Sequence, residues 1–118
     1  MERIRILLTE MPRMLRDVFN QAIAEQPDME LVGVFSGPMS LLLAVGETRA
    51  DAVILELDDS EMPGIGSHLL DSYPHLLILG VTGIGQRAFM YSLRPDKLPL
   101  GELSPQELLD RIREAIRA

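Results

Sequence analysis

The 118-residue chain contains no cysteine and only two histidines, His68 and His75. Without cysteine, disulfide bonds, thiolate metal ligands and a cysteine nucleophile are excluded. The two histidines have no accompanying cluster of ligands, so we interpret them as surface residues rather than as a zinc site. No run approaches the roughly 20 apolar residues of a membrane-spanning helix, and the chain starts in a strand pattern rather than in a signal sequence. We therefore expect a cytoplasmic protein that uses neither a metal nor another cofactor.

Basic residues are also scarce, because 11 lysines and arginines stand against 18 aspartates and glutamates, for a net charge of −7. This charge opposes contact with a polyanion unless the basic side chains gather on one face. Arg111, Arg113 and Arg117 do lie close together, but acidic residues alternate with them, which is typical of a solvated helix face. Direct nucleic-acid binding and membrane binding are therefore not expected.

What the sequence does contain is an apolar core pattern. Hydrophobic residues make up 47% and charged residues 25%, which is ordinary for a globular protein, and the length fits one domain over 1–118. Residues 52–57, Ala-Val-Ile-Leu-Glu-Leu, predict a central strand of a parallel sheet with helices on both faces. Glu56 is the one charged residue in this run. At the carboxyl end of a buried strand it would face the ligand crevice of an open α/β sheet; the alternative is a solvated strand end.

Apolar runs and helical spacing predict the other elements. Strands are expected at 4–8, 30–35 and 76–82, and helices at 12–25, 39–48 and 67–73.

The C-terminal third is less regular. Residues 87–93 show alternation that favours an antiparallel hairpin strand, although a short helix also fits. Two prolines favour a loop over 94–103. Ser104, Pro105 and Glu107 form an N-cap, a first helical residue and a capping box, so they predict the start of a final helix.

Five motifs follow one another along the chain: Ile4-Arg5-Ile6-Leu7-Leu8, the segment 25–33, the segment 50–57, Met62-Pro63-Gly64, and Ser104-Pro105-Gln106-Glu107-Leu108-Leu109. In this order they resemble the receiver domain of bacterial response regulators. The resemblance covers about 1–82 and 101–118. It implies a three-layer α/β fold around a doubly wound parallel sheet, in which the hairpin strand replaces the usual fourth helix.

The resemblance also implies a phosphorylation pocket. A typical receiver holds Mg²⁺ with an acidic pair after the first strand and an aspartate at the end of the third, which accepts the phosphoryl group; a hydroxyl residue and a lysine after the next two strands bind its oxygens. Here those positions hold Thr9 and Glu10, Glu56, Thr82, and Gly101. One carboxylate fewer weakens a Mg²⁺ site, and the lysine is missing. The pocket is either inert or uses Glu56 as a fixed negative charge in place of a phosphate.

We therefore predict a stand-alone pseudo-receiver rather than an enzyme, which acts as a protein-interaction and dimerisation module in bacterial two-component-type signalling or a phosphorelay. The predicted interaction face is an exposed strand edge, and the partner is another protein or a second copy of the chain; a covered edge in a monomer is the alternative. This face comprises Phe89, Met90, Tyr91 and Leu93.

Two other functions remain open from the sequence. Carboxylates at strand ends can bind a metal for phosphoester hydrolysis, which would make the chain a metal-dependent enzyme using Glu10, Glu56, Asp58 and Asp59. The glycine-rich turn at 82–85 suggests a flavodoxin-like domain that binds a small anion, although it is too short for a phosphate-binding fingerprint.

Overall fold

The computed structural model describes residues 3–9, 12–35, 38–57, 69–82, 87–91, 98–101 and 104–117. Residues 69–72 of the described chain are also helical. The named elements, in chain order, are β1 (Ile4–Thr9), α1 (Arg13–Ala24), β2 (Met29–Phe35), α2 (Pro38–Thr48), β3 (Ala52–Leu57), β4 (Leu77–Thr82), β5 (Arg87–Tyr91), β6 (Leu98–Gly101) and α4 (Pro105–Arg117).

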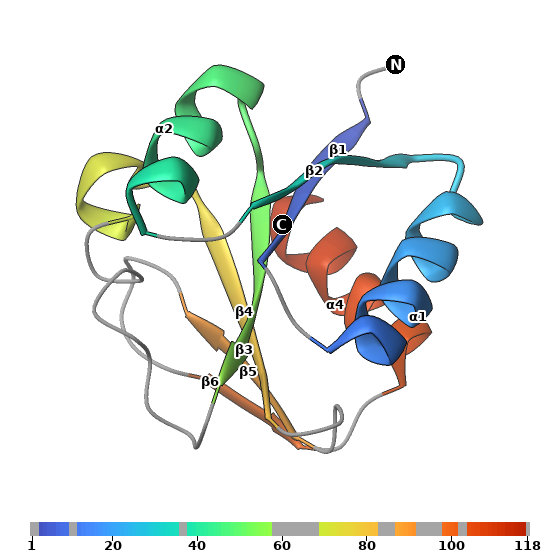
Figure 1. Ribbon diagram of the computed structural model, residues 1–118. Helices are drawn as coiled ribbons and strands as arrows, with labels where there is room; N and C mark the ends of the chain where they lie inside the picture. The colour runs from blue at the N-terminus through green and yellow to red at the C-terminus, as the bar shows by residue number, and fades with distance from the viewer. Residues whose placement is uncertain are drawn as a thin grey trace.

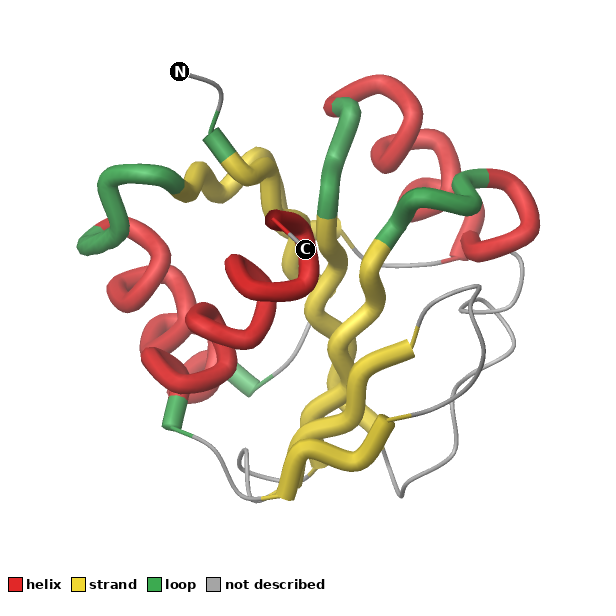
Figure 2. Tube along the Cα trace, turned by 180° about the vertical axis from the view of Figure 1, so that it is seen from behind, coloured by secondary structure: helices red, strands yellow, loops and turns green. Residues whose placement is uncertain are grey.

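The strands form one sheet in the order β2-β1-β3-β4-β5-β6. The first four run parallel, β5 is antiparallel to β4, and β6 is antiparallel to β5. Helices α1 and α4 cover one face, and α2 with the helical residues 69–72 covers the other (Figure 1 and Figure 2). The predicted three-layer α/β fold, including the antiparallel strand after β4, is confirmed.

Side chains of the central strands alternate between two apolar clusters. Ile54 and Leu79 lie in the cluster under α1 and α4, whereas Val53 and Ile78 lie in the cluster under α2. All four are completely buried. Because both faces of β3 and β4 are covered, their sequences are apolar at successive positions up to Glu56 and Thr82, instead of alternating, as expected for the centre of a parallel sheet.

Strand β6 corrects one prediction, because residues 98–101 are not loop. They pair with β5, and Pro99 stands in register with Phe89. Proline lacks an N–H group, which discourages it from an interior strand, but an edge strand tolerates it. Among the described strands β6 is the outermost on its side. Pro99 is therefore compatible with a strand at the edge of the sheet, and Pro95 lies outside the described residues.

The amino ends of the strands are joined through Asp51. Its carboxylate Oδ2 accepts a hydrogen bond from the Arg5 backbone N–H at 2.9 Å, and its own N–H donates to the Arg5 carbonyl at 2.7 Å. Its carbonyl accepts from the Leu77 N–H at 3.1 Å. Asp51 thereby connects the starts of β1, β3 and β4, which places the opposite, carboxyl ends of these strands at one common edge.

Helix α4 begins with the predicted capping box. The Glu107 N–H donates to Ser104 Oγ at 3.1 Å, and the Ser104 N–H donates to Glu107 Oε1 at 3.1 Å. Hydrogen bonds from the backbone and then the side chain of Ser104 lower the pKa of Glu107. Of the helices that the structure describes, none has the length and apolar character needed to cross a membrane.

Candidate functional site at the carboxyl edge of the sheet

Thr9 and Glu56 lie on neighbouring parallel strands, at the carboxyl edge of the sheet. Thr9 is the last residue of β1 and Glu56 the last but one of β3. The Thr9 hydroxyl donates to the Ile54 carbonyl at 3.3 Å. This hydroxyl therefore binds the backbone of the adjacent strand and contributes no negative charge, unlike the carboxylate that a receiver has at this edge. The sequence prediction that the ends of β1 and β3 meet is consistent with this geometry.

Glu56 is half-buried and stands in register with Val81 of β4. Strand alternation puts it on the same face as Ile54, the face covered by α1 and α4. Within the described residues its carboxylate has no hydrogen-bond or ion-pair partner, so it is able to accept a hydrogen bond or a cation.

A metal site would need further ligands beside Glu56. In the described ranges there is no group of three or more His, Cys, Asp or Glu side chains that could hold a metal ion. Glu10, Asp58 and Asp59 lie outside the described residues. Within the part that the structure describes, Glu56 is thus a single carboxylate at the sheet edge.

The position assigned to the missing lysine lies far from Glu56 across the sheet. Glu56 pairs with Val81, Val81 with Ala88, and Ala88 with Gly101, so these residues form one row across four strands. Three strand spacings separate the ends of this row, or about 14 Å. Thr82 is one position farther along β4, in register with Leu57. The lysine position was assigned to Gly101 from its spacing to Ser104 along the chain. That spacing contains no information about strand β5, which lies between β4 and β6.

The predicted interaction face is wrong at Phe89, whose side chain is buried rather than exposed. Phe89 is only 6% exposed and belongs to the core under α2, while Met90 packs against the opposite cluster. Since β6 pairs with β5, the β5 edge is covered where 98–101 lie beside it. For Tyr91 only the backbone is described, in register with Ile78, and Leu93 lies outside the described residues.

Exposed large apolar side chains occur in pairs on two helices, and singly at Val34 of β2 and Ile116 of α4. Met14 and Val18 are exposed on α1, and Met39 and Leu43 on α2, each pair four residues apart. Within α2, Leu41, Ala44 and Val45 reach the core, which leaves Met39 68% and Leu43 58% exposed. The signal was present in the sequence, because α2 is apolar around most of its circumference, whereas a helix packed on one side needs only one apolar stripe.

Comparison with known proteins relates this arrangement to receiver domains. No protein-family model matches the sequence. Over 63 residues, 53% of the chain, it is 30% identical to the protein-glutamate methylesterase/protein-glutamine glutaminase of Thiobacillus denitrificans, and the match spans 18% of that protein.

Solved structures extend the likeness to the whole chain. The response regulator domain of Thermotoga maritima CheB has a TM-score of 0.65 and 20% identity, with 99% of this chain and 98% of that chain covered. The Salmonella typhimurium response regulator RcsB gives a TM-score of 0.57 and 17% identity, with 70% of this chain and 44% of that chain covered. The chain thus spans less than half of the RcsB chain. It has the fold of a response-regulator receiver domain, as the sequence resemblance implied.

Proposed function

We propose that this chain is a pseudo-receiver, a module that is not phosphorylated and works by protein contact in bacterial two-component-type signalling. It would be a binding module rather than an enzyme. The receiver fold supports the signalling context, and the chemistry at the carboxyl edge of the sheet supports the absence of phosphotransfer.

The main support for this proposal is the row of paired residues that runs from Glu56 across the sheet to Gly101. A receiver needs a cation beside the phosphoryl group, yet here the position assigned to the lysine has no side chain and is separated from Glu56 by β4 and β5. Thr9 occupies one of the acidic positions, and its hydroxyl is bound to the Ile54 carbonyl. Glu56 supplies a fixed charge of −1, against nearly −2 for a phosphate. We therefore propose that a partner protein recognises the surface of the fold, and that this contact is not switched by a change of charge at Glu56.

The first experiment tests phosphorylation directly. The protein is incubated with acetyl phosphate and Mg²⁺, and its intact mass is measured by mass spectrometry. We expect no gain of a phosphoryl group in the wild type. We expect none in the Glu56→Asp variant either, because restoring the usual acceptor leaves the distant cation position unchanged. A stable phosphoryl adduct on the wild type would contradict the proposal, and Asp58→Asn and Asp59→Asn variants would then locate it.

The partner that we propose is a second copy of the chain, bound through the exposed α2 side chains Met39 and Leu43. Helix α2 is the better candidate because charged residues accompany the apolar pair of α1, where Arg13 and Asp17 form an exposed ion pair, whereas Glu47 is the one charged residue within α2. A contiguous apolar surface with few charges is typical of protein interfaces.

Sedimentation velocity tests this surface. We expect the wild type to dimerise and Leu43→Lys to be monomeric, because a lysine in the apolar contact would have to lose its hydration. The matched variant Met14→Lys, on α1, should still dimerise. Wild type that remains monomeric at high micromolar concentration, or a Leu43→Lys variant that still dimerises, would refute the α2 interface.

A further inference from the structure

A concave site lies at the amino edge of the sheet, at the opposite end from Glu56. It is a hollow of about 670 Å³, within the range of small-molecule pockets. The start of β1, the end of α2 and the start of β3 enclose it. Its lining residues are Arg3, Arg5, Glu47, Thr48, Arg49 and Asp51.

Three of the 11 basic residues of this acidic chain line this hollow. Arg5 is held in place, because its Nε donates to the Thr48 carbonyl at 2.6 Å. Its second contact, from Nη1 to Glu30 Oε2 at 3.5 Å, is long and solvent-exposed and therefore weak. Arg3 and Arg49 are exposed and, within the described residues, neither has a hydrogen-bond or ion-pair partner. Two guanidinium groups are thus available to a ligand.

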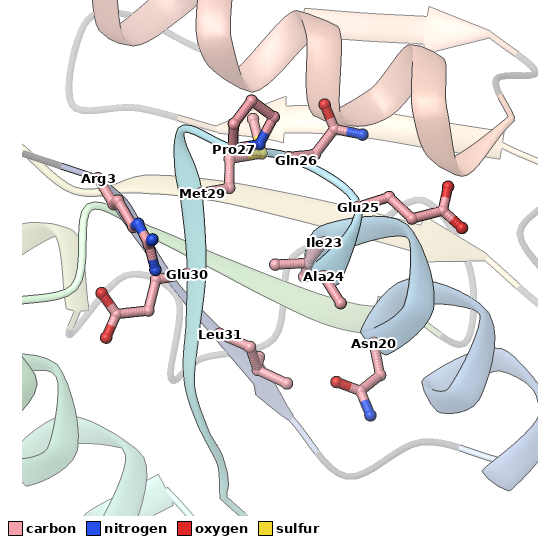
Figure 3. Close-up of a pocket in the computed structure, with 10 residues that line it drawn as sticks. All are labelled: Arg3, Asn20, Ile23, Ala24, Glu25, Gln26, Pro27, Met29, Glu30 and Leu31. Carbon is pink, nitrogen blue, oxygen red and sulfur yellow. The ribbon is translucent and has the colours of Figure 1, made fainter.

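Arg3 lies between this hollow and a smaller one. The second hollow, of about 390 Å³, lies between the end of α1 and β2. Figure 3 shows Arg3 and Glu30 together on one side of β2, whereas Asn20 and Glu25 lie on the other side. The Arg3 guanidinium therefore lies on the side of β2 where Arg5 contacts Glu30.

The backbone conformation of Arg49 is unusual for an arginine. Its φ of 55° is left-handed, a conformation that favours glycine. It follows α2 directly, and the Ala50 N–H donates to the Val45 carbonyl at 3.2 Å, which closes the helix in the usual way for such an ending. A cation at this end gains from the helix dipole, but that gain is smaller than the backbone cost. Stability alone thus does not account for arginine in place of glycine, and strained residues of this kind concentrate at functional sites.

We propose that this hollow binds a phosphorylated sugar-type metabolite. The planar guanidinium groups of Arg3 and Arg49 suit the oxygens of a phosphate, which they bind with paired hydrogen bonds. Glu47 and Asp51 are acceptors only, and would take hydrogen bonds from sugar hydroxyls. Asp51 is already fixed by the Arg5 N–H. Inorganic phosphate offers the two carboxylates only its one or two P–OH protons and no sugar hydroxyls, so we expect it to bind more weakly.

An NMR titration of the ¹⁵N-labelled full chain tests the ligand class at constant ionic strength. Ribose 5-phosphate should shift the amides of 3–5 and 47–51 saturably, with an affinity at least about fivefold above that of inorganic phosphate, the difference attributed to the hydroxyl hydrogen bonds. Unphosphorylated ribose should cause no saturable shift. Absence of saturable shifts, or equal affinity for inorganic phosphate and ribose 5-phosphate, would overturn the proposal.

Two variants test the role of Arg49 in ligand binding. Glycine adopts the left-handed conformation without strain, so Arg49→Gly should keep the helix end, which thermal unfolding verifies, while it weakens ribose 5-phosphate binding by about tenfold. The control Arg13→Gln, at the opposite edge of the sheet, should bind like the wild type. Unchanged affinity in Arg49→Gly, or equal loss in Arg13→Gln, would overturn the assignment. These results are independent of whether the carboxyl edge accepts a phosphoryl group.

Discussion

Replacing Asp28 by alanine should lower the free energy of unfolding by about 3 kcal/mol. Asp28 lies between α1 and β2, and its two carboxylate oxygens accept hydrogen bonds from Arg113 of α4, at 2.6 Å from Nε and 2.7 Å from Nη2. The side chains are only 13% and 22% exposed, respectively. The hydrogen bond to Asp28 raises the pKa of Arg113, so the guanidinium stays charged. In Asp28→Ala the guanidinium would keep its ion pair with Asp110 and its hydrogen bond to Gln26, both at 2.8 Å, but it would lose the two charge-assisted hydrogen bonds to Asp28, which join α4 to the segment before β2 and are the source of the effect.

Urea denaturation of Asp28→Ala, Arg113→Ala and the double variant measures the coupling between the two residues. We expect the double variant to be less destabilised than the sum of the single variants, because the pair acts as a unit. The control is Asp17→Ala, which removes an exposed ion pair with a 3.8 Å contact to Arg13 and should cost less than about 0.5 kcal/mol. A loss below about 1 kcal/mol in Asp28→Ala would show that this ion pair does not anchor α4.

Truncating Leu79 to alanine should cost about 3 to 4 kcal/mol. Leu79 is fully buried in β4, in register with Ile54 of β3 and Met90 of β5, beneath α1 and α4. Neighbours on the two adjacent strands and on the covering helices fix the shape of the cavity, so it cannot collapse readily. The loss is measured by urea denaturation at low micromolar protein concentration.

Leu43→Ala is the matched control for that truncation. The same atoms are removed, but Leu43 is 58% exposed on α2, and alanine favours a helix at least as strongly as leucine does. Its stability should remain within about 0.5 kcal/mol of the wild type. If the two variants lose similar stability, the division between the core at Leu79 and the outer face of α2 is wrong.

The sequence predicted the candidate site in part. It placed Thr9 and Glu56 at strand ends, and because β1 and β3 are adjacent and parallel, the two residues lie at one edge. It did not predict the distance from Glu56 to Gly101, because that distance depends on the number of strands between them. For the same reason it placed Phe89 at an exposed edge, whereas β6 covers part of β5 and the Phe89 side chain is buried.

The sequence by itself determined the features that depend on neighbours a few residues away. The apolar runs of β1, β3 and β4 are of this kind, and so is the capping box, which joins Ser104 to Glu107 within one helical turn. The tertiary structure alone decided that 98–101 would be a strand and that Arg113 would pair with Asp28, 85 residues away. An edge strand and a long-range ion pair are stable only where the rest of the fold has already placed their partners, and no local pattern encodes that position.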